Sequence, residues 1–242
     1  MGQRRPVAAI IPCKDEGERI AATVTAVRAL PGVDLVVVVD DGSTDDTSAR
    51  AHAAGAEVMR HERNAGKAAA LTTGVRHVRA IVRERDLETH DYLFVDGDLE
   101  DSARNLGVLL PPLGPAEDGT RGADMTIATL PPQKVAGGGR GFVVRLAREG
   151  IADLTGFQAV QPLSGMRALT DEAFTAASPL ARGWGVEVGL TVDVLRAGLR
   201  IEEVPCELHH RVTGSDWRGQ VHRAKQYRDV WLALTARRWR RR

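Results

Sequence analysis

Residues 94–98 read Phe-Val-Asp-Gly-Asp, an apolar segment that ends in two aspartates separated by one glycine. The apolar run at 92–95 predicts a buried strand, so Asp96 and Asp98 would follow directly beyond its carboxyl end. Carboxylates placed in this way are the oxygen ligands that hard divalent cations such as Mg²⁺ or Mn²⁺ prefer. Asp-x-Asp also occurs in ordinary turns, so the segment has to be interpreted together with the rest of the chain.

Strand-like and helix-like segments alternate through the first half of the chain. The order β-α-β-α-β-α-β predicts an α/β fold with a mainly parallel central sheet flanked by helices. Ligands bind such sheets at the carboxyl ends of the strands, where Asp40, Asp41, Asp96 and Asp98 fall. The expected strands are 7–12, 35–39, 57–60 and 92–95, and the expected helices are 17–30, 44–54 and 67–83.

The second half is less regular but shows no linker, so residues 1–242 are expected to form a single domain. Extended segments are expected at 124–130, 163–169 and 200–206, and helices at 142–154, 185–197 and 218–238.

The composition sets limits on partners and location. A net charge of +1 gives no bulk attraction to nucleic acid. The two cysteines lie far apart without metal-ligand spacing, and no apolar run has the length of a membrane span, so we expect a reduced, cytoplasmic protein.

Four stretches, taken in order, resemble family 2 glycosyltransferases of the GT-A fold. They are Ile-Pro-Cys-Lys-Asp-Glu at 11–16, Val-Asp-Asp-Gly-Ser-Thr-Asp-Asp-Thr at 39–47, Arg-Asn-Ala-Gly-Lys at 63–67 and Asp-Gly-Asp at 96–98. The resemblance implies a Rossmann-like nucleotide-sugar half at about 6–130 and a smaller acceptor-binding half, with the C-terminal helix, at about 131–242.

The resemblance also implies roles for individual residues. Asp41 would meet the base of the nucleotide, Asp96 would reach the ribose or donor sugar, and Asp98 would bind Mg²⁺ or Mn²⁺. This chemistry is sensible, because carboxylates accept hydrogen bonds from base and ribose groups and a divalent cation stabilises a departing diphosphate. The full set of implied donor-side residues is Pro12, Cys13, Glu16, Asp41, Lys67, Asp96 and Gly97.

Several residues of these four stretches also have structural interpretations. Asp40, Ser43 and Thr44 are also typical turn residues, with Ser43 or Thr44 as the cap of the helix at 44–54. Lys67 begins a predicted helix, where a cation opposes the helix dipole. That local cost favours an anionic ligand near Lys67, and a solvated lysine is the alternative.

Further motifs narrow the resemblance to glucosyl-3-phosphoglycerate synthases. They are Gly-Gly-Gly-Arg at 137–140, Gln-Pro-Leu-Ser-Gly at 161–165, Gly-Trp-Gly-Val-Glu at 183–187 and His-His-Arg at 209–211. By this resemblance Arg140 holds the acceptor's phosphate, Ser164 and Gly165 bind substrate, Glu187 is catalytic beside sugar and acceptor, and His210 completes the metal site. The chain departs from the pattern at Phe142, where the family has a hydroxyl residue, and at Met166, where it has glutamate.

Two of the roles implied in the second half also have alternatives. Neighbouring residues of a strand point to opposite faces, so at most one of His209 and His210 would reach a metal. Glu187 is equally compatible with a buried, paired carboxylate at a helix start.

The chain ends in a helix with Trp231 and the basic run 237–242. Contact with anionic lipid headgroups at the inner face of the membrane would suit a polyprenyl-phosphate acceptor, as in the related dolichyl-phosphate mannosyltransferases. A solvated tail is the other interpretation.

The sequence therefore predicts a metal-dependent hexosyltransferase. Its donor would be a UDP- or GDP-sugar, with UDP-glucose favoured, and its acceptor a phosphate-bearing molecule such as 3-phosphoglycerate. A polyprenyl- or dolichyl-phosphate acceptor and a non-catalytic nucleotide-sugar binder are the alternatives. A nucleotidyltransferase is disfavoured, because residues 13–17 do not form a Gly-rich phosphate loop. The sequence does not decide whether transfer retains or inverts the configuration of the sugar, or whether the chain forms a homodimer.

Overall fold

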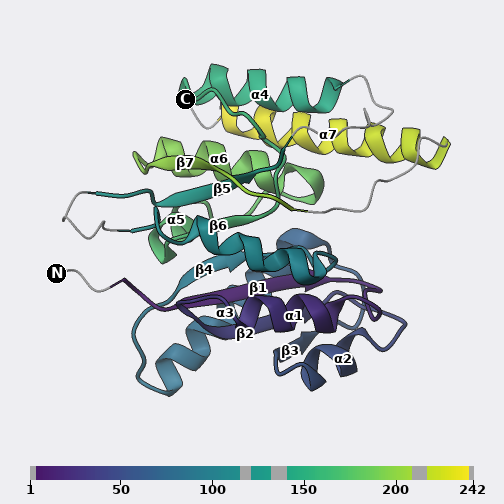
Figure 1. The fold of residues 1–242 in the computed structure, drawn as a ribbon. Helices are drawn as coiled ribbons and strands as arrows, with labels where there is room; N and C mark the ends of the chain where they lie inside the picture. Colours follow the sequence, from purple (N-terminus) through teal and green to yellow (C-terminus); the bar gives the residue numbers. More distant parts are fainter. Residues whose placement is uncertain (1–3, 115–120, 132–140, 209–216, 240–242) are drawn as a thin grey trace.

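The computed structural model describes residues 4–114, 121–131, 141–208 and 217–239 (Figure 1). Its centre is a seven-stranded sheet with the strand order β3-β2-β1-β4-β6-β5-β7. Neighbouring strands are parallel except where β6 pairs antiparallel with β4 and β5. The strands are β1 (Val7–Cys13), β2 (Val33–Asp40), β3 (Glu57–Arg60), β4 (Asp91–Phe94), β5 (Met125–Thr129), β6 (Arg167–Leu169) and β7 (Ile201–Pro205).

Helices cover both faces of the sheet. The helical segments are α1 (Ile20–Arg28), α2 (Thr47–Ala53), α3 (Lys67–Glu84), η1 (Glu100–Leu109), α4 (Phe142–Thr155), α5 (Asp171–Ala176), η2 (Gly183–Gly185), α6 (Val186–Arg196) and α7 (Trp217–Trp239). Apolar residues of α1 and η1 pack in one core cluster, and those of α3, α5 and α6 pack in a second.

A third apolar cluster joins α4, α6 and α7 and makes an outer layer over α6. Figure 1 shows α4 and α7 lying side by side there, far from α1 and α2. None of the helices in the described part of the chain combines the length and the apolar character needed to cross a membrane.

The mainly parallel sheet flanked by helices confirms the predicted fold class, and each strand expected in the first half is present within one or two residues of its expected bounds. In the second half only three residues of the extended segment expected at 163–169 form a strand, and the η1 and α5 segments were not predicted. The predicted cap of α2 is wrong: the helix begins at Thr47 with Asp46 at the cap position. Ser43 instead accepts a hydrogen bond from the Asp15 backbone at 2.9 Å.

Parallel pairing brings the predicted strand-end residues to one edge of the sheet. Cys13 is in register with Asp40, and Asp40 with Arg60. The chain stays paired beyond the strand ends, since the Asp41 amide donates to the Cys13 carbonyl at 2.8 Å. The loops that follow β1, β2 and β4 therefore start close together.

Gly74 tests how closely α3 packs on the sheet. A Cβ atom at Gly74 would overlap Ile10 Cγ2 and lie 3.3 Å from Val39 Cγ2. Because this core has no room for an added methyl group, we expect Gly74→Ala to lower the free energy of unfolding by about 1–3 kcal/mol. Urea denaturation measures this free energy. The control is Arg76→Ala, on the exposed side of α3, which should change the free energy of unfolding by less than about 0.5 kcal/mol. Wild-type stability of Gly74→Ala would show that the helix does not pack as described.

Candidate active site

The loops after β1 and β2 are held together as one unit. Residues of the acidic segment accept hydrogen bonds from three consecutive backbone amides, each at 2.9 Å: Ser43 from Asp15, Thr47 from Glu16 and Asp45 from Gly17. The predicted nucleoside-pocket segment at 12–16 is thereby fixed by the side chains of 43–47. Asp40 is fully buried and accepts hydrogen bonds from the Ser43 amide and the Ser48 hydroxyl, so it acts as a turn residue.

Asp41 fastens the loop that leads into α3. Its carboxylate accepts hydrogen bonds from the amides of Ala65 and Gly66, both at 2.7 Å, and lies 2.7 Å from His61 Nδ1. Burial alone would raise the pKa of Asp41, but these hydrogen bonds together hold it below its ordinary value. His61, whose Nε2 lies 2.9 Å from Thr73 Oγ1, was missed from the sequence because nothing near it marks it as a partner of Asp41.

Lys67 makes contacts with both halves of the chain. Its ammonium lies 2.9 Å from Asp96 Oδ1, at the end of β4, and 3.1 Å from Glu187 Oε1, in the first turn of α6. Burial lowers the pKa of Lys67, but the charges of the two carboxylates outweigh it and leave the pKa above its ordinary value. The ammonium therefore stays charged at neutral pH.

Both side chains make ion pairs within the protein. Lys67 is paired rather than solvated, and carboxylates of the protein offset its position at a helix start. Glu187 has the burial and pairing expected of a structural carboxylate near a helix start, with a side chain only 7% exposed. A charged substrate would meet a preformed Asp96–Lys67–Glu187 triad, a name kept below for these three side chains.

Two glycines fit closely against these groups. A Cβ atom at Gly165 would overlap the Lys67 ammonium and lie 3.2 Å from Asp96 Oδ2. A Cβ atom at Gly97 would lie 3.0 Å from Cys13 Cβ and 3.6 Å from Glu16 Cγ. The predicted donor-side residues and Gly165 are thus brought to one place, and buried Ser164 precedes Gly165 in the same segment.

Asp98 is the predicted metal ligand that the structure describes. It is half-buried and follows Asp96 by two residues, on the same loop as the triad. Within the described ranges, no group of three His, Cys, Asp or Glu side chains is arranged to hold a metal. His210 and Arg140, the other predicted ligand and the predicted phosphate contact, lie outside the described residues. Carboxylate oxygens at Asp98 suit Mg²⁺ or Mn²⁺.

The two departures from the resembled pattern remove polar groups. Met166 is buried in the core, with 2% of its surface exposed, so it offers nothing to an acceptor. Phe142 opens α4 and is 51% exposed, with the Arg145 guanidinium 5.1 Å from the ring centroid.

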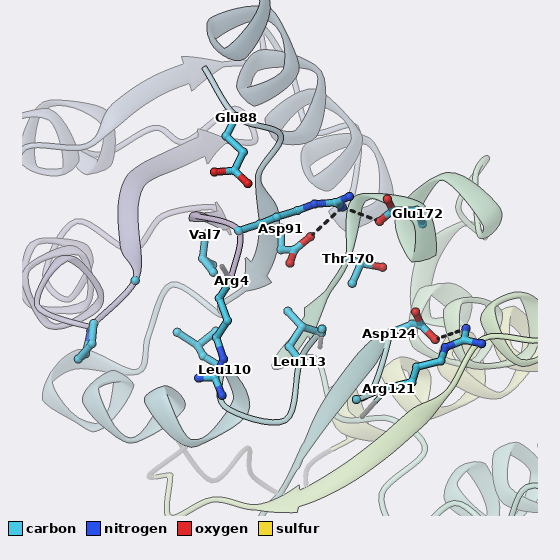
Figure 2. Close-up of a pocket in the computed structure, with 15 residues that line it drawn as sticks. Arg4, Val7, Glu88, Asp91, Leu110, Leu113, Arg121, Asp124, Thr170 and Glu172 are labelled. Atoms are coloured by element: carbon cyan, nitrogen blue, oxygen red, sulfur yellow. Dashed lines mark hydrogen bonds and ion pairs between the residues drawn. The ribbon is translucent and has the colours of Figure 1, made fainter. Parts of the chain in front are cut away.

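A cavity of about 680 Å³ lies at the opposite edge of the sheet, where the strands begin (Figure 2). Val7 and Asp91, the first residues of β1 and β4, line it. Arg5 crosses it, 3.7 Å from Asp91 Oδ1 and 2.8 Å from Glu172. This cavity contains none of the predicted site residues, and a β1 of seven residues spans about 20 Å between it and the triad's edge.

Known proteins share this architecture. The model of the family described as "Glycosyl transferase family 2" matches residues 8–119. The crystal structure of glucosyl-3-phosphoglycerate synthase from Mycobacterium tuberculosis in complex with phosphoglyceric acid is 30% identical, with a TM-score of 0.73, and covers 96% of this chain and 80% of that chain. The chain belongs to glycosyl transferase family 2. Its sheet and helices have the GT-A fold, as expected from the sequence.

Other relatives of this family 2 chain carry two different names, glucosyl-3-phosphoglycerate synthase and glycosyltransferase AglJ. Glucosyl-3-phosphoglycerate synthase of Mycolicibacterium smegmatis is 35% identical over 207 residues, 81% of this chain and 66% of the relative. Glycosyltransferase AglJ of Haloferax volcanii is 30% identical over 213 residues, 87% of this chain and 65% of the relative. The chain thus spans slightly less than two thirds of these curated relatives. Another structure of the M. tuberculosis synthase, 29% identical with a TM-score of 0.74, contains Mn²⁺, UDP-glucose and phosphoglyceric acid and covers 96% of this chain and 79% of that chain.

Asp91 provides a pH test of the packing at the cavity edge. Burial raises the pKa of this carboxyl from 3.8 to about 6, although Arg5 opposes the shift. The folded state therefore holds a proton that the unfolded state releases, and stability falls as the pH rises from about 4 to 6. We expect Asp91→Asn to match wild type at pH 4 and to be more stable by about 2–3 kcal/mol at pH 7.

Urea denaturation at pH 4, 5, 6 and 7 measures this difference. Glu88→Gln, an exposed position on the same cavity, is the control and should keep the wild-type pH dependence. A pH dependence that is the same in Asp91→Asn and wild type would contradict the assignment.

Proposed function

We propose that the chain is a metal-dependent glucosyltransferase that moves glucose from UDP-glucose to a phosphate-bearing acceptor, with 3-phosphoglycerate as the first candidate. The observation that carries the proposal is the triad, because it joins a donor-side loop of a family 2 fold to the helix predicted to face the acceptor. The M. tuberculosis synthase, which was solved with Mn²⁺, UDP-glucose and phosphoglyceric acid, supports the choice of substrates.

The donor is proposed to bind across the ends of β1, β2 and β4. Pro12, Cys13 and Glu16 would shape the nucleoside pocket on a loop that already has fixed backbone geometry. Asp41 already takes part in three hydrogen bonds with the loop before α3. The remaining lone pairs of its carboxylate would accept hydrogen bonds from the base.

The diphosphate and sugar are proposed to lie against the triad. Asp98, together with His210, would hold Mg²⁺ or Mn²⁺, and the metal when bound neutralises the departing diphosphate. Lys67 supplies a fixed positive charge near the phosphates or the sugar, and Asp96 accepts hydrogen bonds from ribose or sugar hydroxyls. Gly97 and Gly165 let substrate and side chains approach the backbone closely.

The acceptor is proposed to bind in the half formed by residues 131–242, between Gly165 and the start of α6. Glu187 would orient the attacking hydroxyl with the oxygen that Lys67 does not occupy, and Arg140 would contact the acceptor's phosphate. Met166 and Phe142 lack the polar groups of the resembled pattern, so this pocket would bind fewer acceptor oxygens through side chains.

The exposed side of α7 favours a second acceptor class. Trp231, Leu232 and Trp239 are 47%, 50% and 72% exposed there, with Arg228 and Arg238 also on the surface. Aromatic and arginine side chains together suit anionic headgroups, so a polyprenyl phosphate presented at a membrane surface is the second candidate. A second copy of the chain is the competing occupant of this face.

Replacing Asp98 tests the proposed metal site. With UDP-glucose, Mn²⁺ and either acceptor, we expect Asp98→Ala to lower kcat at least about 100-fold, because the leaving diphosphate loses its metal. Thermal unfolding should show a wild-type midpoint without ligands, and Mn²⁺ with UDP should raise the midpoint of wild type but not of the variant. Chromatographic detection of UDP and glucosylated product measures turnover.

Asp101→Ala is the matched control, since Asp101 lies three residues further on and its side chain is 87% exposed. It should keep wild-type turnover. Full activity in Asp98→Ala would refute the metal assignment, and stabilisation by UDP-glucose without product from any acceptor would favour a non-catalytic binder.

A further inference from the structure

The segment 160–165 lies in the connection between α4 and β6 and ends at Gly165, against Lys67 and Asp96. Its only internal backbone hydrogen bond among the described residues runs from the Ser164 amide to the Gln161 carbonyl at 3.1 Å. Its other backbone groups need partners from elsewhere, so its position depends on those partners. Two charged residues, one on each of two strands, supply those partners.

Glu203 of β7 binds the start of the segment. Its carboxylate accepts hydrogen bonds from the Val160 amide at 2.8 Å and from the Gln161 amide at 2.9 Å. The Gln161 side chain in turn donates to the Leu130 carbonyl at the end of β5. The first two residues of the segment are therefore tied to neighbouring parallel strands.

Arg167 of β6 binds the rest of the segment. Its guanidinium donates to the Ser164 carbonyl at 2.9 Å and to the Pro162 carbonyl at 3.4 Å. The side chain is fully buried, and that burial lowers the pKa of Arg167 to about 10, while the charges of Glu187 and Glu203 counteract part of the effect. Within the described residues no carboxylate lies within ion-pair distance of this guanidinium.

Arg167 also reaches the helix that carries Glu187. It donates to the Thr191 hydroxyl at 2.9 Å, and that hydroxyl donates to the Glu187 carbonyl at 2.9 Å. One guanidinium thus contacts the segment ending at Gly165 and, on α6, Thr191, whose hydroxyl links it to the first turn that carries Glu187.

A buried guanidinium without a carboxylate partner is costly, and an apolar side chain would fill the same core position more favourably. The hydrogen bonds of Arg167 to the Ser164 and Pro162 carbonyls offset part of this cost. They also place the groups around Lys67, and transfer rates depend on small errors in the position of reacting groups.

We infer that Arg167 and Glu203 form a clamp on segment 160–165 and that Arg167 is a positioning residue for the transfer reaction. The clamp sets the distance of Gly165 and Glu187 from the Lys67 ammonium without contacting substrate. This inference rests on the proposed function, because positioning matters only if the triad meets reacting groups.

Arg167→Met tests the inference, with Arg79→Met as matched control. Arg79 also makes several side-chain bonds, to Asp171, Tyr92 and Thr175, but lies on α3 about 18 Å of helix beyond Lys67. We expect Arg167→Met to lower kcat at least 10-fold with the Kd for UDP within twofold of wild type, because the nucleotide loops are untouched. Arg79→Met should lose thermal stability but keep kcat.

Thr191→Val is the second variant, since it keeps the shape of the buried side chain and removes only the link between Arg167 and α6. We expect a smaller fall in kcat, about threefold to tenfold, again with unchanged UDP binding. This variant tests the clamp if Arg167→Met does not fold. Unchanged kcat in folded Arg167→Met, or in Thr191→Val if Arg167→Met does not fold, would overturn the inference.

A second readout needs no substrate. The chain has four lysines, so acetylation by acetic anhydride followed by mass spectrometry reports each one separately. We expect Lys67 to react faster in Arg167→Met than in wild type, with Lys14, which is 38% exposed, as internal reference. If Lys67 reacts at the same rate in Arg167→Met and in wild type, the clamp is overturned whatever the activity. If the labelling rate of Lys67 does change but the wild-type protein transfers no sugar, only the proposed function is refuted.

Discussion

The contact of one ammonium with two carboxylates is the interaction on which the rest of this structure depends. Lys67 starts α3, Asp96 follows β4, and Glu187 lies in the first turn of α6. Alone, each charge would be unfavourable in its position: a cation at a helix start, and a carboxylate with 7% of its side chain exposed. Together they offset one another and join the starts of α3 and α6 to the loop after β4.

The polar segments around the triad follow the same logic. Side chains of 43–47 hold the loop after β1, Asp41 holds the loop before α3, and Glu203 and Arg167 hold segment 160–165. In each case a short irregular segment is positioned by side chains from another element or loop of the fold. A site whose segments are held in this way before substrate arrives would lower the cost of aligning the proposed donor and acceptor.

The sequence predicts the placement of the strand-end residues well, because parallel strands place their carboxyl ends at one edge and motifs after successive strands must meet. Asp96, Gly97 and the loop at 12–16 are found where that rule puts them, and Lys67 reaches the same place from the start of α3. The rule says nothing of β6, a three-residue antiparallel strand, and a single arginine in the apolar run 166–169 gives no sign of its partners. Glu203 is 42 residues from Gln161, and His61 is 20 from Asp41, so periodicity does not reveal either pairing.

A double-mutant cycle between Lys67 and Glu187 tests the central claim most directly. The free energy of unfolding is measured by urea denaturation for wild type, Lys67→Met, Glu187→Gln and the double variant at pH 7. A triad that couples the two halves predicts non-additivity of about 1–3 kcal/mol, because each single variant leaves a buried charge without its partner. Additivity within about 0.5 kcal/mol would contradict the account, since Lys67 and Glu187 would then contribute to stability independently.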